Sequence, residues 1–287
     1  MKNDSLITSA YVNTFIKKRK RDIHKGDCGK VLIFAGSKGM AGAAVLCARA
    51  ALRAGAGLVR VSVPEELFPI LQIGVPEATC ITRERLLEDL MQYSAIAIGP
   101  GLGDEAQNGI LIRKILETTD KPVVIDADGL NLLRNDLAVM KNAKAKLIIT
   151  PHPGEAARLL GRKTADINRD RLQSALELAT ITGAVTVLKG AGSVVATPEG
   201  KTYINTTGNP GMATGGSGDV LTGVIAALAG QGLDPEAATT AGVFLHGVAG
   251  DLASDRMGEY GLIASDIANM VALAIKSILE SREPLEK

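Results

Sequence analysis

Short apolar runs alternate with longer amphipathic stretches along most of the chain. The apolar runs predict buried strands, and the amphipathic stretches predict helices. Strands are expected at 30–35, 58–63, 94–99, 123–126, 146–150, 185–189, 193–196 and 203–205. Helices are expected at 6–20, 43–55, 86–91, 110–116, 156–160, 170–182, 219–230, 235–254 and 264–281. Successive strand–helix units predict a mainly parallel sheet between two layers of helices, an α/β/α sandwich.

A single domain is expected over residues 1–287, because no linker, internal repeat or low-complexity tract divides the chain. The formal net charge is +1, so no overall field points to nucleic acid or to an acidic partner. The basic run at 17–21 has no interleaved aromatic residues, and we interpret it as a solvated helix end rather than a nucleic-acid arm.

Three cysteines, Cys28, Cys47 and Cys80, share no metal-ligand spacing and fit a reducing compartment. No apolar run reaches the length of a membrane span, and no signal-peptide pattern opens the sequence. We therefore expect a cytoplasmic protein without a membrane partner.

The most informative stretch is rich in glycine and leads into a helix. Gly216, Ser217 and Gly218 come directly before Asp219 and the apolar residues that follow it. A flexible turn at a helix N-terminus directs free N–H groups and the positive end of the helix dipole at one point, which favours a phosphate. Asp219 would repel that phosphate unless it accepts a proton from a substrate hydroxyl or helps to hold a bridging metal. The alternative, a carboxylate that only caps the helix, is disfavoured by the glycine run.

Four glycine-containing loops are expected at one edge of the sheet, at 36–43, 99–104, 150–155 and 208–219. Lys189 ends a strand before a glycine turn and is a candidate contact for nucleotide phosphate. His152 stands between two prolines, and ligand contact and a surface turn are equally good interpretations. Glu155 is assigned to the first turn of the next helix, and His246 to the core.

The sequence also matches a dinucleotide-binding fingerprint at Gly101, Gly103 and Ala106, with Asp126 at the end of the next strand. This interpretation is disfavoured because the βαβ unit that should open such a domain lies elsewhere. The loops together predict phosphoryl transfer from a nucleotide to a substrate hydroxyl. Asp219 would act as the base, and Mg²⁺ would neutralise the phosphates.

Several longer motifs resemble one family. They are Gly-Ser-Lys-Gly-Met-Ala-Gly-Ala-Ala from Gly36, Gly-Pro-Gly-Leu-Gly from Gly99, Asp-Ala-Asp-Gly-Leu-Asn from Asp126, Thr-Pro-His-Pro-Gly-Glu from Thr150, Val-Leu-Lys-Gly-Ala-Gly-Ser from Val187, and the glycine run from Gly208 to Asp219. In this order, they resemble the NAD(P)H-hydrate dehydratases, ribokinase-like enzymes that restore NAD(P)H from its damaged, hydrated form.

The resemblance implies a ribokinase-like three-layer α/β/α sandwich and a hydro-lyase reaction. Asp219 would deprotonate the C6 hydroxyl of the (6S) hydrate, which attacks the terminal phosphate of ADP. Phosphate then leaves, giving AMP and NAD(P)H. The resemblance assigns hydrate binding to Ala43, Gly103, His152 and Asp219. It assigns nucleotide binding to Lys189, Gly190, Ala191, Gly192, Ser193 and Gly218. Mg²⁺ and a homotetramer are also implied, while the metal ligands stay unassigned.

Many bacterial relatives carry an N-terminal epimerase domain, whereas only a short segment precedes the first predicted buried strand of this chain. We therefore expect no epimerase domain, and a separate NAD(P)H-hydrate epimerase as a functional partner. ADP is favoured over ATP as the phosphoryl donor. The main alternative is a ribokinase-like kinase that uses ATP on a small hydroxylated vitamin precursor. A third hypothesis is a catalytically silent nucleotide-binding module, which a carboxylate facing phosphates disfavours.

Overall fold

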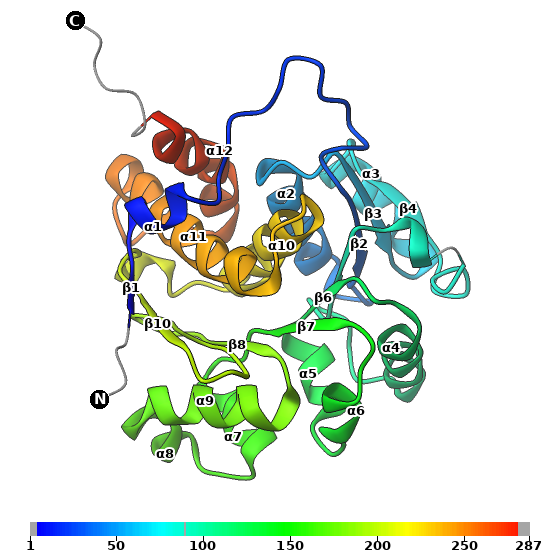
Figure 1. Ribbon diagram of the computed structural model, residues 1–287. Helices are drawn as coiled ribbons and strands as arrows, with labels where there is room; N and C mark the ends of the chain where they lie inside the picture. The colour runs from blue at the N-terminus through cyan, green and yellow to red at the C-terminus, as the bar shows by residue number, and fades with distance from the viewer. Residues whose placement is uncertain (1–4, 89, 281–287) are drawn as a thin grey trace, which may run out of the picture.

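The computed structural model describes residues 5–88 and 90–280. Its ten strands form one sheet in the order β1-β10-β9-β8-β7-β6-β5-β2-β3-β4 (Figure 1). The strands are β1 (Ser5–Ile7), β2 (Lys30–Phe34), β3 (Leu58–Ser62), β4 (Thr79–Ile81), β5 (Ala95–Ile98), β6 (Pro122–Ile125), β7 (Lys146–Ile149), β8 (Val185–Leu188), β9 (Val194–Ala196) and β10 (Thr202–Asn205). Of these strands, only β9 is antiparallel to both of its neighbours. The prediction of a mainly parallel sheet is therefore confirmed.

Helices cover both faces of this sheet (Figure 1). The α-helices are α1 (Ser9–Asn13), α2 (Ala41–Arg53), α3 (Phe68–Gly74), α4 (Ala106–Thr118), α5 (Ala127–Leu133), α6 (Ala138–Lys141), α7 (Pro153–Leu160), α8 (Thr164–Arg169), α9 (Arg171–Thr182), α10 (Ser217–Gly230), α11 (Pro235–Met257) and α12 (Ala264–Glu280). Helices α2, α10, α11 and α12 lie on one face, and α4 to α9 lie on the other. Three short 3-10 helices occupy Glu65–Leu67, Leu90–Gln92 and Pro210–Met212.

The central strands are apolar on both faces, because each face is buried under helices. In β2, Val31 and Ile33 belong to the core under α2 and α10, whereas Leu32 and Phe34 belong to the core on the opposite face. All four side chains are completely buried. This explains why the strands appear in the sequence as continuous apolar runs rather than as alternating patterns.

The strand order reverses between β2 and β5. From β2 the chain proceeds outward to β3 and β4, and it then returns to the other side of β2 with β5, β6, β7 and β8. The loops that follow β2 and β5 therefore diverge, and such a reversal opens a crevice at the carboxyl ends of the strands. A hydrogen bond of 2.8 Å from Gly36 N to Pro100 O joins the two loops at this point.

The N-terminal segment differs from the prediction. Strand β1 and the short helix α1 occupy part of the range 6–20 that was expected to be one helix. Strand β1 pairs in parallel with β10, and Ile7 is completely buried. The open edge of β10 offers backbone partners that an isolated helix would not satisfy, so sheet pairing prevails over the local helical pattern.

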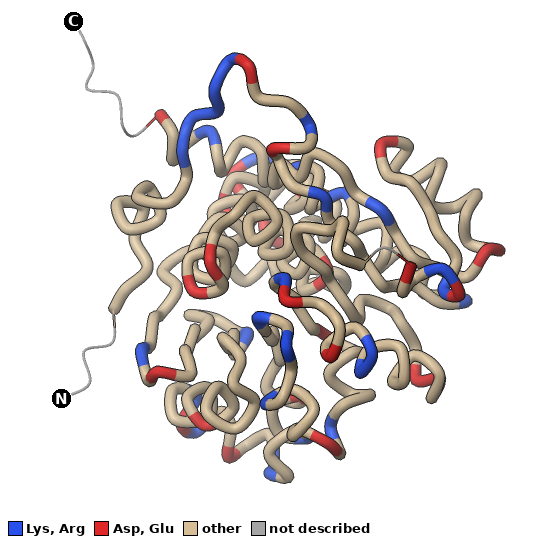
Figure 2. Tube along the Cα trace, turned by 45° about the vertical axis from the view of Figure 1, so that its right-hand side comes forward, with Lys and Arg blue, Asp and Glu red and all other residues tan. Residues whose placement is uncertain are grey.

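The basic residues 17–21 are exposed on the irregular loop between α1 and β2, so the interpretation as a helix end is wrong. Figure 2 shows them as a continuous basic stretch of this loop, while charges of both signs are spread over the rest of the surface. Two further differences concern residues 68–91. No prediction covered α3, which contains Pro69 near its start and ends at Gly74. Residues 86–88 form turns instead of the expected helix.

Helix α10 packs closely against α2 through a residue without a side chain. A Cβ atom on Gly223 of α10 would lie 2.2 Å from the backbone oxygen of Cys47 in α2. The close approach of these helices positions the N-terminus of α10 at the sheet edge. Among residues 5–88 and 90–280, no helix combines the length and the apolar character that crossing a membrane requires.

Gly223→Ala is expected to lower the free energy of unfolding by about 1–3 kcal/mol, because the added methyl group forces two helix backbones apart. Urea unfolding measures the change. Gly42→Ala in α2 is the matched control, since no atom lies within 4 Å of the added methyl group, and it should leave stability unchanged or slightly higher. Equal stabilities of the two variants would contradict the packing argument.

Candidate active site

Helix α10 begins at the sheet edge with a backbone that requires glycine. Gly216 precedes the helix with a φ of 90°, and a Cβ atom there would lie 2.5 Å from Leu46 Cδ1. Gly218 and Asp219 occupy the first turn of the helix, where backbone N–H groups have no acceptor within the helix. The turn therefore has the geometry of an anion-binding helix N-terminus. The anion-hole role of Gly216, Ser217 and Gly218 stays a prediction.

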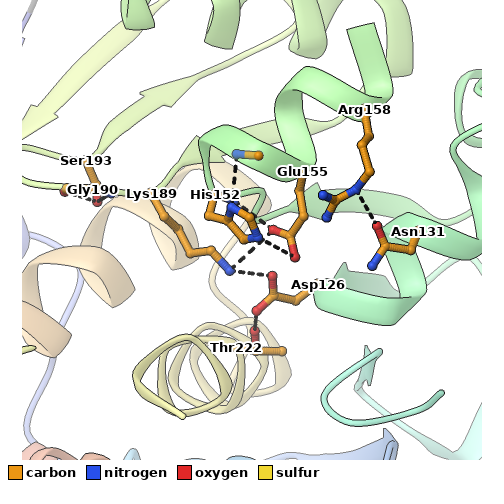
Figure 3. Close-up of polar contacts among 10 residues, drawn as sticks. Asp126, Asn131, His152, Glu155, Arg158, Lys189, Gly190, Ser193 and Thr222 are labelled. Atoms are coloured by element: carbon orange, nitrogen blue, oxygen red, sulfur yellow. Dashed lines mark hydrogen bonds and ion pairs between the residues drawn. The ribbon is translucent and has the colours of Figure 1, made fainter. Parts of the chain in front are cut away.

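A buried network of charged groups lies beside this turn (Figure 3). Lys189 Nζ is 2.6 Å from Asp126 Oδ1, and the Thr222 hydroxyl donates a hydrogen bond of 2.8 Å to Asp126 Oδ2. Glu155 Oε2 is 3.8 Å from the same ammonium group. Asp126 is 1% exposed, and it joins the ends of β6 and β8 to α10. A side chain at Gly218 would come within 3.2 Å of Lys189 Nζ, so glycine leaves room for this network.

Lys189 keeps its positive charge in this environment. Burial by itself lowers the pKa of Lys189, but the carboxylates of Asp126 and Glu155 raise it above its ordinary value. The ammonium group is therefore charged at neutral pH, as binding of a phosphate requires.

Asp219 has the properties of a general base. Burial, followed by the negative charge of Asp126, raises its pKa to about 7, although Lys189 opposes the shift. The smaller contributions of Asp128 and Glu155 also raise it. A carboxylate with a pKa near the working pH exchanges protons most effectively in catalysis.

His152 forms the N-cap of α7, and its ring orientation is fixed by two contacts. Its Nδ1 accepts a hydrogen bond of 3.0 Å from Gly154 N, so the ring proton resides on Nε2 in the neutral form. Nε2 is 3.4 Å from Glu155 Oε1, and Glu155 Oε2 accepts a hydrogen bond from His152 N. Burial and then Lys189 lower the pKa of His152. The neutral imidazole is half exposed and can contact a ligand.

The turn after β8 is held by side-chain contacts at both ends. Ser193 Oγ donates a hydrogen bond of 3.0 Å to Gly190 O. Arg171 donates to Ala191 O at 2.6 Å and to Leu188 O at 3.1 Å. Gly190 has a φ of 143°, in the region that favours glycine. The turn is thus rigid before any ligand binds.

A second loop faces this turn and is fixed by Asp251 of α11. Gly208 N and Asn209 Nδ2 donate hydrogen bonds of 2.9 and 3.0 Å to the Asp251 carboxylate. The loop approaches α11 closely because Gly247 and Gly250 have no side chains to exclude it.

Between these loops lies a cavity of about 680 Å³. All the residues assigned to nucleotide binding line it: Lys189, Gly190, Ala191, Gly192, Ser193 and Gly218. His152 and Ser217 also line it, as does His246, which was assigned to the core. His246 is 9% exposed, its Nε2 is 3.4 Å from Ser217 Oγ, and burial lowers its pKa to about 4. It is therefore a neutral core residue that also forms part of the cavity wall.

Ala43 and Gly103 are not among the residues of this cavity wall. Gly103 N donates a hydrogen bond of 2.9 Å to Asp128 Oδ2, and Asp128 contributes to the raised pKa of Asp219. The loop after β5 meets the start of α2 beside Ala43. Ser37 Oγ is buried there and has no hydrogen-bond partner among the described residues.

The comparisons with known proteins agree with this geometry. A sequence profile of the family described as NAD(P)H-hydrate dehydratase matches residues 31–272. The ADP-dependent (S)-NAD(P)H-hydrate dehydratase of Neisseria meningitidis is 42% identical over 257 residues, which cover 88% of this chain and 86% of that protein.

The chain belongs to the NAD(P)H-hydrate dehydratase family. The resemblance found in the sequence is thereby confirmed, as is the prediction that the chain is an enzyme.

Two further family members extend the comparison. The bifunctional NAD(P)H-hydrate repair enzyme Nnr of Moorella thermoacetica is 43% identical over 296 residues, which cover 99% of this chain and 56% of that protein. The chain thus spans about half the length of such relatives. The ADP/ATP-dependent NAD(P)H-hydrate dehydratase of Bacillus subtilis, co-crystallised with ATP/Mg²⁺, superposes with a TM-score of 0.87 and 33% identity. That superposition covers 96% of this chain and 99% of that one and confirms the ribokinase-like three-layer fold.

The sequence alone does not reveal most of the charged groups that surround Asp219. Asp126 and Glu155 belong to the family motifs, but the sequence assigns neither of them a role at the site. Asp128 and Thr222 received no role. One signal was available, because Asp126 and Asp128 directly follow an apolar strand, where parallel sheets place ligand-binding groups. Ala127 between them has a φ of 47°, and such strain in a residue other than glycine is concentrated at functional sites.

The described residues do not form a metal site from protein side chains alone. No group of three or more His, Cys, Asp or Glu side chains within residues 5–88 and 90–280 is arranged to hold an ion. Mg²⁺ is commonly bound by one or two carboxylates together with substrate phosphates. Asp126 and Glu155 supply two such carboxylates beside Lys189, which itself lines the cavity.

Asp219→Asn is expected to raise the free energy of unfolding at pH 8 by about 1–3 kcal/mol and to change it little at pH 4. The pKa of Asp219 in the folded protein, about 7, lies above its ordinary value of 3.8. Between these values the folded protein binds more protons than the unfolded chain, so its stability falls as the pH rises. The neutral amide removes this penalty.

Urea unfolding of the wild type and of Asp219→Asn at both pH values measures the effect. Asp255→Asn, on the exposed surface of α11, is the control and should show no such difference. A gain of equal size at pH 4 and pH 8 would mean that packing, rather than charge, stabilises the Asp219 variant.

Proposed function

We propose that this chain catalyses the ADP-dependent dehydration of (6S)-NAD(P)H hydrate to NAD(P)H. The observation that carries the proposal is the position of Asp219. It combines a pKa of about 7 with a place in the first turn of α10, directly after Ser217 and Gly218, which line the cavity. The N. meningitidis relative bears the name of this activity. The kinase alternative has less support, because the relatives described above are named dehydratases or hydrate repair enzymes.

The reaction begins when Asp219 takes the proton of the C6 hydroxyl of the hydrate. The resulting oxygen attacks the terminal phosphorus of ADP, and the bond to the departing AMP breaks. The C6–O bond then breaks and phosphate leaves with the bonding electrons. Loss of a proton from C5 restores the double bond of the reduced nicotinamide ring. The sum is hydrate plus ADP giving NAD(P)H, AMP and phosphate.

The two substrates would meet at Asp219. ADP would bind in the cavity with its phosphates against Lys189, the turn from Gly190 to Ser193, and the N–H groups at Gly218. The hydrated ring would lie against His152 and the loops of Ala43 and Gly103. This arrangement directs the C6 hydroxyl toward the terminal phosphate with the base between them, so that reaction is favoured by proximity.

Mg²⁺ would be held by Asp126 and Glu155 together with the phosphates of ADP, where it would neutralise negative charge on the phosphates. Lys189, which now contacts both carboxylates, would then turn its ammonium group toward a phosphate oxygen. ADP is the proposed donor, and the B. subtilis relative is described as ADP/ATP-dependent. We propose that an epimerase converts the other hydrate epimer, that the enzyme is a homotetramer, and that it works in the cytoplasm, where free cysteines persist.

The purified protein is expected to restore absorbance of the reduced nicotinamide ring when mixed with the hydrate, Mg²⁺ and ADP, with AMP and phosphate formed in equal amounts. Asp219→Ala should lower kcat by at least roughly 10²-fold, because the general base is lost. Asp255→Ala is the control for a carboxylate on the exposed surface. Absence of turnover by the wild type with both ADP and ATP, in the proven presence of the (6S) epimer, would overturn the proposal.

The value of kcat/KM is expected to increase with pH and to level off above an inflection near 7, as Asp219 loses its proton. Burial is the largest cause of the raised pKa of Asp219, and the charge of Asp126 is the second largest. The residual activity of Asp126→Asn should therefore show its inflection at lower pH. Initial rates between pH 5 and pH 9 measure both profiles. An unchanged inflection in the variant would show that Asp126 does not set the pKa of the base.

A further inference from the structure

We propose that Arg158, held in place by Asn131, binds the pyrophosphate of the hydrated dinucleotide. This inference rests on the proposed function, and it adds a phosphate subsite at a residue outside the wall of the ADP cavity.

Arg158 is exposed on α7 but has a fixed orientation. Its Nε donates a hydrogen bond of 2.9 Å to the side-chain oxygen of Asn131, which lies on α5 (Figure 3). Arg134 Nη1 donates a hydrogen bond of 3.2 Å to the backbone oxygen of the same residue. Asn131 thus links α5 to Arg158 of α7. The terminal Nη groups of Arg158 donate to no other described residue, so they remain available for an anion.

Arg158 lies next to the ring that is proposed to contact the nicotinamide. A Cβ atom on Gly154 would lie 2.8 Å from His152 Cε1 and 3.8 Å from Arg158 Nη1. Both side chains therefore border the same small space. The positive charge of Arg158 also contributes to lowering the pKa of His152, after burial and Lys189. Figure 3 shows Arg158 and Lys189 on opposite sides of His152 and Glu155.

The chemistry of the substrate offers an anion close to the ring. In the hydrated dinucleotide, one ribose separates the nicotinamide ring from the pyrophosphate, while the 2′-phosphate of the NADP form lies at the adenosine end. A guanidinium beside the histidine that contacts the ring is therefore placed for the pyrophosphate. Arg binds phosphate oxygens through two parallel hydrogen bonds, and its anchored Nε reduces the entropy lost on binding.

Arg158→Gln should raise KM for the hydrates of both NADH and NADPH on the order of 10-fold, with KM for ADP and kcat nearly unchanged. Asn131→Ala should give a smaller increase, because the guanidinium remains but loses its support. Arg162→Gln is the matched control, since Arg162 follows the same helix but pairs with Glu177 at 2.8 Å. The hydrate of the reduced nicotinamide riboside, which has no phosphate, should show no difference between Arg158→Gln and the wild type.

Binding of unhydrated NADH gives a second measurement that does not depend on turnover. The protein contains no tryptophan, so the fluorescence of the reduced nicotinamide reports binding without that background, and Kd should rise on the order of 10-fold in Arg158→Gln. If the wild type binds NADH but does not turn over the hydrate, the proposed function fails while the subsite is still tested.

Three results would overturn the subsite. Unchanged KM and Kd in Arg158→Gln would show that Arg158 contacts no substrate phosphate. A loss confined to the NADPH hydrate would place the 2′-phosphate there instead of the pyrophosphate. An equal loss with the phosphate-free riboside would mean that Arg158 only maintains the structure around His152.

Discussion

The ion pair between Lys189 and Asp126 is the contact on which the site depends. It joins the carboxyl ends of β8 and β6, and Thr222 extends it to the first turns of α10. Both groups are largely buried, and removing one partner of such a pair typically costs about 3–5 kcal/mol because the other charge is left unpaired. The pair fixes where the N-terminus of α10 meets the sheet. The absence of a side chain at Gly218 permits this contact, and the absence at Gly223 lets α10 approach α2 closely enough to maintain it.

The same pair makes the surroundings of Asp219 different from those of the neighbouring carboxylates. Asp126 and Glu155 share the ammonium group of Lys189, whereas Asp219 lies among negative charges in a partly buried position. The environment therefore raises the pKa of Asp219 above its ordinary value, and a carboxylate with such a raised pKa is suited to proton transfer. This arrangement reduces the stability of the protein, which is commonly observed where a site must be reactive.

The fold could be predicted largely from the apolar runs, because strands buried on both faces are almost continuous in the sequence. The conformation of residues 6–20 could not be predicted in this way. It depends on pairing with the edge of β10, a strand that lies nearly two hundred residues later in the sequence. The glycine turn before Asp219 and the position of Lys189 were also visible locally. The partnership of Lys189 with Asp126 was not, because 63 residues separate them and no local pattern links the two strand ends. For the same reason, Glu155 appeared only as a helix-capping residue, although its carboxylate also faces the lysine.

The charges at the sheet edge are arranged to be completed by phosphate ligands. Lys189 is the cation nearest to Asp126 and Glu155, and Arg158 is anchored only through Nε. Phosphate groups bound near Lys189 and Arg158 would each satisfy a cation, and a divalent ion carried with the nucleotide would compensate the two carboxylates that Lys189 releases. The negative charge of the phosphates favours the protonated form of Asp219, whereas Lys189 and the divalent ion favour the ionised form. Compensation of the phosphate charge by these two cations would therefore keep Asp219 able to accept the proton of the substrate hydroxyl.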